Sequence, residues 1–211
     1  GGAIYSSANS TIDVNDCRFF QNDATQNSSN ILVGGGIVAF GVAYLNNTEF
    51  DSNIPEGAIL EGLSTIDNCT FINNNKAGLI TRNGTIRYCD FSFNKGGGLV
   101  TLPLLSPQLI SNRVAFCSFV NNENLTNEGG PYGFGGAINA TACSIENCSF
   151  IENKTAGCGA VCFNTSGIVF PGIDTVLIAN CIFDSNEGGA LSVFGGSPSN
   201  VTLLRNLRFK N

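Results

Sequence analysis

The pattern Phe-x-x-Asn occurs seven times in this chain of 211 residues, at intervals of 20 to 33 residues. Two residues before each Phe there is a Cys, or in one copy a Thr, and three residues before that position the residue is always aliphatic. The copies are Phe19/Asn22, Phe50/Asn53, Phe71/Asn74, Phe91/Asn94, Phe119/Asn122, Phe150/Asn153 and Phe183/Asn186. A period of this length with fixed apolar positions is typical of solenoids, in which each repeat covers the core of its neighbour.

The spacing inside the repeat indicates strands and not helices. Cys and Phe two residues apart face the same side of an extended segment, and the residue between them, usually polar, faces the other side. Helical repeats need apolar residues three and four apart over ten or more positions, and the sequence has no such stretch. The odd spacing between the aliphatic residue and the Cys predicts a corner or bulge between two short inward-facing strands. We therefore predict an all-β fold, a right-handed parallel β-helix of about eight coils that forms one domain over residues 1–211.

Equal positions of successive coils stack at roughly 4.8 Å along the axis of such a fold. The Phe residues are therefore expected to form a buried aromatic stack. We expect Asn to occupy a sharp corner, because Asn tolerates the left-handed backbone conformation, and to bond through its amide to the next Asn in the row. The expected inward Cys row comprises Cys17, Cys69, Cys89, Cys117, Cys148 and Cys181, with Thr48 in the second copy.

The nine cysteines permit two interpretations. Stacked neighbours lie within the Cα range that permits a disulfide, yet parallel side chains point the same way, which favours a row of small buried residues. Cys143, Cys158 and Cys162 lie outside the row, and a loop-clamping disulfide among them is left open. Zinc is disfavoured because the chain has no His and no Cys-x-x-Cys pair, and we expect no metal or other cofactor.

Composition restricts the class of protein. Charged residues make up only 12% of the chain, the net charge is −6, and no basic cluster occurs, so nucleic acid is not an expected partner. No apolar run approaches the length of a membrane span, and membrane insertion is not expected. The chain begins with neither Met nor a signal segment, which favours a processed piece of a longer product.

Eleven Asn-x-Ser/Thr triplets form a second signal, and they indicate N-glycosylation and passage through a secretory pathway. The alternative is that Asn and Thr crowd the turns of a β-helix and create the triplet by composition. The triplet at Asn153 is the weakest because this Asn belongs to the Asn row. The candidate acceptors are Asn9, Asn27, Asn46, Asn68, Asn83, Asn124, Asn139, Asn147, Asn164 and Asn200, of which Asn9, Asn27, Asn124, Asn164 and Asn200 lie in expected loops.

A Gly-Gly-Ala-Ile/Leu motif alternates with Phe-x-x-Asn, as at Gly1–Ile4, Gly135–Ile138 and Gly188–Leu191. This pairing resembles the repeat of the chlamydial polymorphic membrane proteins, and the resemblance spans the whole chain. It implies a surface-exposed β-helix with a role in adhesion. The dense glycosylation triplets, and the lack of a following β-barrel transporter, depart from that family.

A solenoid of this kind is compatible with three classes of function. A carbohydrate-active enzyme needs converging carboxylates, but Glu49 and Asp90 are expected two coils apart, and Asp51 and Asp184 five coils apart. An adhesin-type binding domain would use exposed aromatic residues, for which Tyr5, Tyr44, Tyr88 and Tyr132 are candidates. We favour a third function, a non-catalytic, extracellular or cell-surface structural solenoid. Neither end has a polar capping repeat, and the sequence predicts that copies of the chain stack end to end into a filament or surface layer.

Overall fold

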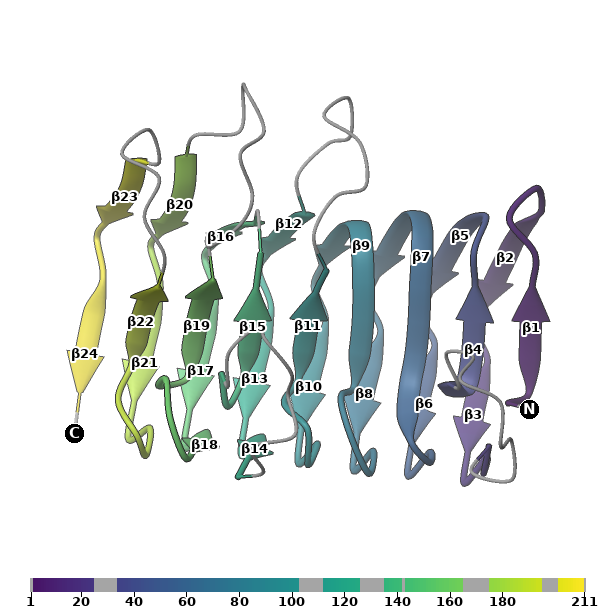
Figure 1. Ribbon diagram of the computed structural model, residues 1–211, viewed down its shortest axis with the longest axis horizontal. Helices are drawn as coiled ribbons and strands as arrows, with labels where there is room; N and C mark the ends of the chain where they lie inside the picture. Colours follow the sequence, from purple (N-terminus) through teal and green to yellow (C-terminus); the bar gives the residue numbers. More distant parts are fainter. Residues whose placement is uncertain are drawn as a thin grey trace.

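The computed structural model describes residues 2–24, 34–102, 112–125, 135–141, 143–164, 175–194 and 201–210. Every regular element in these ranges is a β-strand, and the strands wind into successive coils of a parallel β-helix (Figure 1). Every pair of named strands is parallel, each strand bonding to the equivalent strand one coil away. The predicted β-helix is therefore confirmed, and side chains at equal positions of successive coils lie in rows along its axis.

Each coil has three faces. The first face comprises β1 (Ile4–Ser6), β4 (Gly34–Ala39), the starts of β7 (Glu56–Asp67) and β9 (Leu79–Arg87), β11 (Leu99–Thr101), β15 (Ile138–Ala140), β19 (Val161–Asn164) and β22 (Leu191–Phe194). The second comprises β2 (Thr11–Asn15), β5 (Val42–Asn46), the ends of β7 and β9, β12 (Asn112–Ala115), β16 (Cys143–Glu146), β20 (Thr175–Ala179) and β23 (Val201–Arg205). The third comprises β3 (Arg18–Phe20), β6 (Glu49–Asp51), β8 (Thr70–Ile72), β10 (Asp90–Ser92), β13 (Ser118–Val120), β17 (Ser149–Ile151), β21 (Ile182–Asp184) and β24 (Arg208–Lys210). A short pair, β14 (Glu123–Asn124) and β18 (Lys154–Thr155), lies beside the third face.

The Phe side chains of the third face form one continuous stack inside the coil. Successive ring centroids from Phe19 to Phe209 lie 4.7 to 5.3 Å apart, with interplanar angles of 2 to 19°. The rings from Phe50 to Phe183 are at most 1% exposed. They pack against aliphatic rows of the first and second faces, represented by Leu79 and Ile86, which are also fully buried. Because each ring packs between its two neighbours in the stack, the core extends along the whole rod.

The Asn side chains form a second buried row with complete hydrogen bonding in mid-rod. Asn94 Nδ2 donates to Asn122 Oδ1 at 2.9 Å and to the carbonyl oxygen of Phe71 at 2.9 Å. Asn94 Oδ1 accepts from the backbone N–H of Asn74 at 3.1 Å and from Asn74 Nδ2 at 2.9 Å. The same bonds repeat from Asn22 to Asn186, and the predicted bond from amide to amide is confirmed. The five middle members are 0% exposed, namely Asn53, Asn74, Asn94, Asn122 and Asn153.

The residues that adopt the left-handed conformation at the corners differ from those predicted. The left-handed conformation falls on the residue before each row residue and not on the Asn of the row itself. Before the Cys row these residues are Asp16, Asn47, Asn68, Tyr88, Phe116, Asn147, Asn180 and Asn206, with φ between 47 and 57°. Before the Asn row they are Gln21, Ser52, Asn73, Phe93, Asn121, Glu152 and Ser185. Two such corners bracket each three-residue strand of the third face from β3 to β21. The corner before the Cys row explains the odd spacing between the aliphatic residue and the Cys.

Asn53 illustrates this correction. We expected Asn53 itself to adopt the left-handed conformation, but Ser52 before it does so, with φ of 57°. The turn at Ser52 directs the next side chain into the coil, where Asn53 Nδ2 donates to the carbonyl oxygen of Phe19 at 3.0 Å and to Asn74 Oδ1 at 3.1 Å. The expectation for Asn53 and for the other Asn of the row was therefore wrong about the backbone, because these Asn residues are selected for their buried amide and not for their φ.

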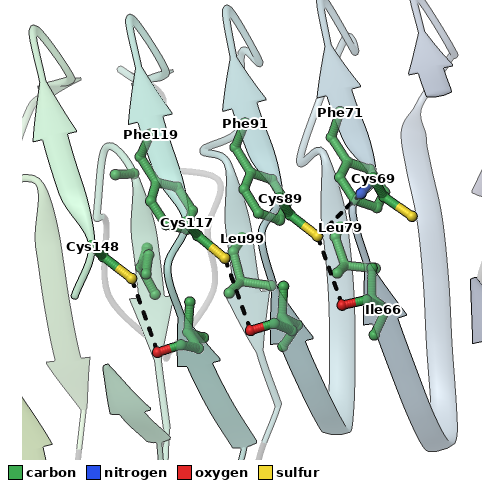
Figure 2. Close-up of a cluster of buried hydrophobic side chains, with 14 of the residues drawn as sticks. Ile66, Cys69, Phe71, Leu79, Cys89, Phe91, Leu99, Cys117, Phe119 and Cys148 are labelled. Carbon is green, nitrogen blue, oxygen red and sulfur yellow. Dashed lines mark hydrogen bonds between the residues drawn. The ribbon is translucent and has the colours of Figure 1, made fainter. Parts of the chain in front are cut away.

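The Cys row lies inside the coil beside the Phe stack, as Figure 2 shows for Cys69, Cys89, Cys117 and Cys148. None of the nine cysteines forms a disulfide, so the row consists of small, mostly buried side chains. Cys69 Sγ donates to the carbonyl oxygen of Asp67, two residues earlier, at 3.2 Å, and the later thiols repeat this bond. Cys17 is an exception to the prediction: it is exposed, because it lies in the first described coil and is covered on one side only, by the coil that contains Thr48.

The spacing of the Phe residues implies insertions between coils at 23–32, 102–111, 123–134 and 162–175, and these segments fall mostly outside the described residues.

Candidate functional surfaces

Charged side chains on the outer surface pair mainly between neighbouring coils. Arg18 contacts Glu49 at 2.7 Å and Asp51 at 2.9 Å, and Lys210 contacts Asp184 at 3.2 Å. Figure 1 shows β6 and β10 separated by β8, which places Glu49 and Asp90 two coils apart. In the described ranges no three His, Cys, Asp or Glu side chains gather into a possible metal site.

The pKa of each outer carboxylate depends on the groups that donate hydrogen bonds to it. Partial desolvation opposes ionisation of Asp51, but hydrogen bonds from Ser52, Arg18 and Asn73 hold its pKa below the usual range. Hydrogen bonds from Ser185 and Lys210 likewise lower the pKa of Asp184. These carboxylates stabilise the stacking of coils, and each contributes modestly because it is near solvent.

Glu56 is the carboxylate with the largest perturbation. It opens β7 directly after Pro55 and is half-buried. Burial raises its pKa from 4.5 to about 7, against the attraction of Lys76, which lowers the pKa. A single carboxylate with a raised pKa is a candidate proton donor, but hydrolysis of a glycosidic bond by a β-helix enzyme needs a second carboxylate at a suitable distance.

The structure divides the candidate glycosylation positions by exposure. Asn9, Asn46, Asn68 and Asn147 are exposed, whereas Asn83, Asn124 and Asn139 are 8%, 5% and 5% exposed. Asn124 was expected in a loop, but it lies in β14. Asn27 and Asn200 lie outside the described residues, and Asn164 closes β19. Because an attached sugar needs room at Nδ2, the buried positions suit it poorly in the folded protein.

The corner before the Cys row forms an exposed line of side chains along the rod. We call it the corner row, and it comprises Asp16, Asn47, Asn68, Tyr88, Phe116, Asn147, Asn180 and Asn206. Its Asn side chains bond along the line, as in the bond from Asn68 Nδ2 to Asn47 Oδ1 at 3.1 Å. The line passes beside a polar hollow of about 310 Å³ lined by Asp16, Arg18, Asn47, Glu49 and Asn68. In its middle, Tyr88 and Phe116 stack with ring centroids 5.2 Å apart.

The two terminal coils carry opposite charge. The last coil, residues 201–210, has three cations and no acid, whereas residues 2–24 have three Asp and one Arg. Apolar side chains are exposed on the last coil, where Leu204 is 50% and Phe209 is 56% exposed. A hollow of about 430 Å³ beside it is lined by Phe183, Asn186 and Phe209, at the end of the buried rows. Among the described strands, those of the first and last coils pair on one edge only.

Sequence reasoning missed the corner row and Glu56. The corner row had a visible signal, because Asn or Asp precedes the Cys position in six of its eight members. The stacking of Tyr88 on Phe116 follows directly once those positions are aligned. Glu56 had no such signal, since its burial depends on a neighbouring coil. Of the expected exposed tyrosines, Tyr5, Tyr44 and Tyr88 are 68%, 45% and 57% exposed, and Tyr132 lies outside the described residues.

Comparisons with known proteins agree with this architecture. The family model for the right-handed β-helix region matches residues 36–207. No curated protein matches the chain. Among solved structures, a trypsin-treated variant of QnrB1, described as a plasmid-mediated fluoroquinolone resistance protein, is 10% identical. That alignment covers 100% of this chain and 91% of QnrB1 with a TM-score of 0.24. The described residues contain no helix long and apolar enough to cross a membrane.

The pKa of Glu56 predicts a pH dependence of stability. Between about pH 4.5 and 7 this side chain is ionised in the unfolded chain but protonated in the folded protein, so the free energy of unfolding falls as the pH rises. Replacing Glu56 by Gln removes this loss, so the variant should gain on the order of 2 kcal/mol over the parent between pH 5 and 8. Chemical denaturation at both pH values measures the difference. An equal stability difference at the two pH values would contradict the assignment.

Proposed function

The chain belongs to the right-handed β-helix family, and from that premise we propose that it is an extracellular, N-glycosylated structural rod that stacks end to end with copies of itself. The observation that carries this proposal is the continuation of the coil rows into the first and last described coils, whose strands pair on one edge and which carry opposite charge. No catalytic step is part of the proposed function. A filament or surface layer is the assembly that such a contact produces.

The contact between copies continues the rows of the coil. The exposed ring of Phe209 ends the Phe stack, and Phe19 begins it, so a second copy in register extends the stack by one step. In that register the exposed Arg205 continues the row of Asn15, beside Asp13 and Asp16 of the next copy, whereas Arg208 continues the row of Arg18. Because the contact joins two different surfaces along a straight axis, it does not close on itself and generates an open filament.

Glycosylation is supported by the exposed acceptors. Asn9 lies in the turn between β1 and β2, Asn46 closes β5, and Asn68 and Asn147 occupy the corner row. At these four positions a sugar projects into solvent without entering the core. We do not extend the proposal to Asn83, Asn124 and Asn139, since their side chains are buried.

A second candidate is an adhesin-type binding domain related to the chlamydial polymorphic membrane proteins. The exposed rings of Tyr5 and Tyr44 favour it, because exposed aromatic side chains are frequent anchors of protein interfaces. Replacing both tyrosines by Ser would abolish adhesion to a receptor-bearing surface but would leave filaments intact.

The end-to-end contact predicts filaments that depend on charge. Electron microscopy of native protein should show rods longer than one chain, and raising the salt concentration should shorten them because the terminal charges are screened. Reversing the charge beside Asp13 and Asp16 with Arg205→Glu should dissociate the filaments. Lys95→Glu, an exposed change in mid-rod, is the matched control and should leave them intact. Discrete monomers of the parent, or a longer native chain whose further coils cover these ends, would contradict the proposal.

Glycosylation predicts a loss of mass on enzymatic release. Treating natively sourced protein with an amide-cleaving glycosidase should lower its intact mass and convert each modified Asn to Asp. Peptide mapping should place the conversion at Asn9, Asn46, Asn68 or Asn147 and not at Asn83 or Asn139, whose side chains are buried. An unchanged mass would remove this part of the proposal and leave the filament untouched.

A further inference from the structure

Four consecutive members of the corner row form an unusual sequence of side chains. They are Asn68, Tyr88, Phe116 and Asn147, from four successive coils, and all four are exposed. Tyr88 is 57% and Phe116 is 50% exposed, and their rings stack with an interplanar angle of 13°. Every other member of the row is Asn or Asp. The middle of a polar line therefore exposes an apolar stack with an Asn at each end.

The backbone conformation of this aromatic pair is energetically unfavourable. Tyr88 and Phe116 have φ of 54 and 57°, in the left-handed region that Asn and Asp tolerate and bulky residues avoid. The pair combines this strain with exposed apolar surface, and such a combination indicates a site where another group compensates. Among the described residues, the only ring that stacks on either of them is the other member of the pair.

Both Asn neighbours of the pair begin glycosylation triplets, Asn68-Cys69-Thr70 and Asn147-Cys148-Ser149. The amide nitrogens in this row point along the axis toward the preceding coil: Asn47 donates to Asp16, Asn68 donates to Asn47, and Asn206 donates to Asn180. The residue one coil before Asn147 is Phe116, whereas the residue one coil before Asn68 is Asn47. The row therefore offers an aromatic neighbour to the side-chain nitrogen of Asn147 and a polar neighbour to that of Asn68.

We infer that the glycan on Asn147 packs its first sugar ring against the face of Phe116, with Tyr88 supporting that ring from behind. Because Tyr88 and Phe116 stack along the axis, one face of Phe116 is turned toward the Asn147 coil. That face carries partial negative charge, and the C–H groups on one side of a sugar ring complement it. The contact covers the exposed aromatic pair and fixes the direction of the glycan along the rod. This inference rests on the proposed glycosylation.

Nuclear magnetic resonance of the full chain from a eukaryotic secretory host tests the contact. Protons of the first sugar on Asn147 should shift upfield, because they lie over an aromatic ring, and those of the first sugar on Asn68 should not. Phe116→Asp should abolish the shift; Asp16 shows that this row accommodates Asp, and the change creates no new glycosylation triplet. Phe116→Leu keeps an apolar side chain without a ring and should abolish it too. Tyr88→Asp should retain most of the shift.

Site occupancy, measured first by peptide mass spectrometry, separates this inference from the proposal on which it rests. A modified Asn147 whose sugar protons are unshifted, or are unaffected by both Phe116 variants, would overturn the contact. An unmodified Asn147 beside a modified Asn68 would also overturn the contact but leave glycosylation standing. The absence of sugar from every triplet would overturn both.

Discussion

The hydrogen-bonded row of Asn side chains is the constraint on which the register of this β-helix depends. Each middle Asn uses both amide hydrogens and accepts two bonds through Oδ1, and all the bonds join different coils. A slip of one residue in any coil would leave these fully buried groups without partners, and each such group costs about 1–3 kcal/mol. Apolar stacking alone discriminates weakly between registers, since a β-helix interior accepts many apolar neighbours. The amide row therefore specifies the stack that the Phe row stabilises.

Because the Asn row fixes the register, the connections and the outer residues of each coil can vary. Once the third face is fixed by its two corners, the connections elsewhere can vary in length, and successive Phe residues are 20 to 33 residues apart with no change in the ladder. The outer positions likewise vary, from ion pairs such as Arg87 with Asp67 to the aromatic pair of Tyr88 and Phe116. Functional residues are therefore expected on the outer surface and on the terminal coils, because the interior side chains serve to pack the core.

The fold was predictable because its signal repeats. Asn53 and Asn94 each belong to a row whose members recur at equal positions, so errors at one copy are corrected by the others. The left-handed corner was assigned to these Asn residues and not to the residue before them, since Asn favours that conformation and nothing in one sequence separates the two positions. The prediction that Cys17 is buried was wrong because burial of a row residue needs a neighbouring coil on each side. The pKa of Glu56 was not predictable because it depends on packing against other coils. The pairing of Tyr88 with Phe116 joins residues 28 apart, and it can be predicted only after the repeats are aligned.

The most direct test replaces one Asn of the row and compares two neighbours. Asn94→Leu exchanges a buried amide for an apolar side chain of similar size. It leaves Asn74 N–H and one hydrogen of Asn74 Nδ2 without their acceptor, and it removes one donor to the Phe71 carbonyl. The account predicts a loss of about 3–6 kcal/mol in the free energy of unfolding, as large as the roughly 3–5 kcal/mol expected for Phe91→Ala. Asn75→Leu, the same exchange at an exposed position of the preceding coil, should cost less than about 1 kcal/mol. A loss for Asn94→Leu no larger than that of Asn75→Leu would contradict the claim that the amide row specifies this fold.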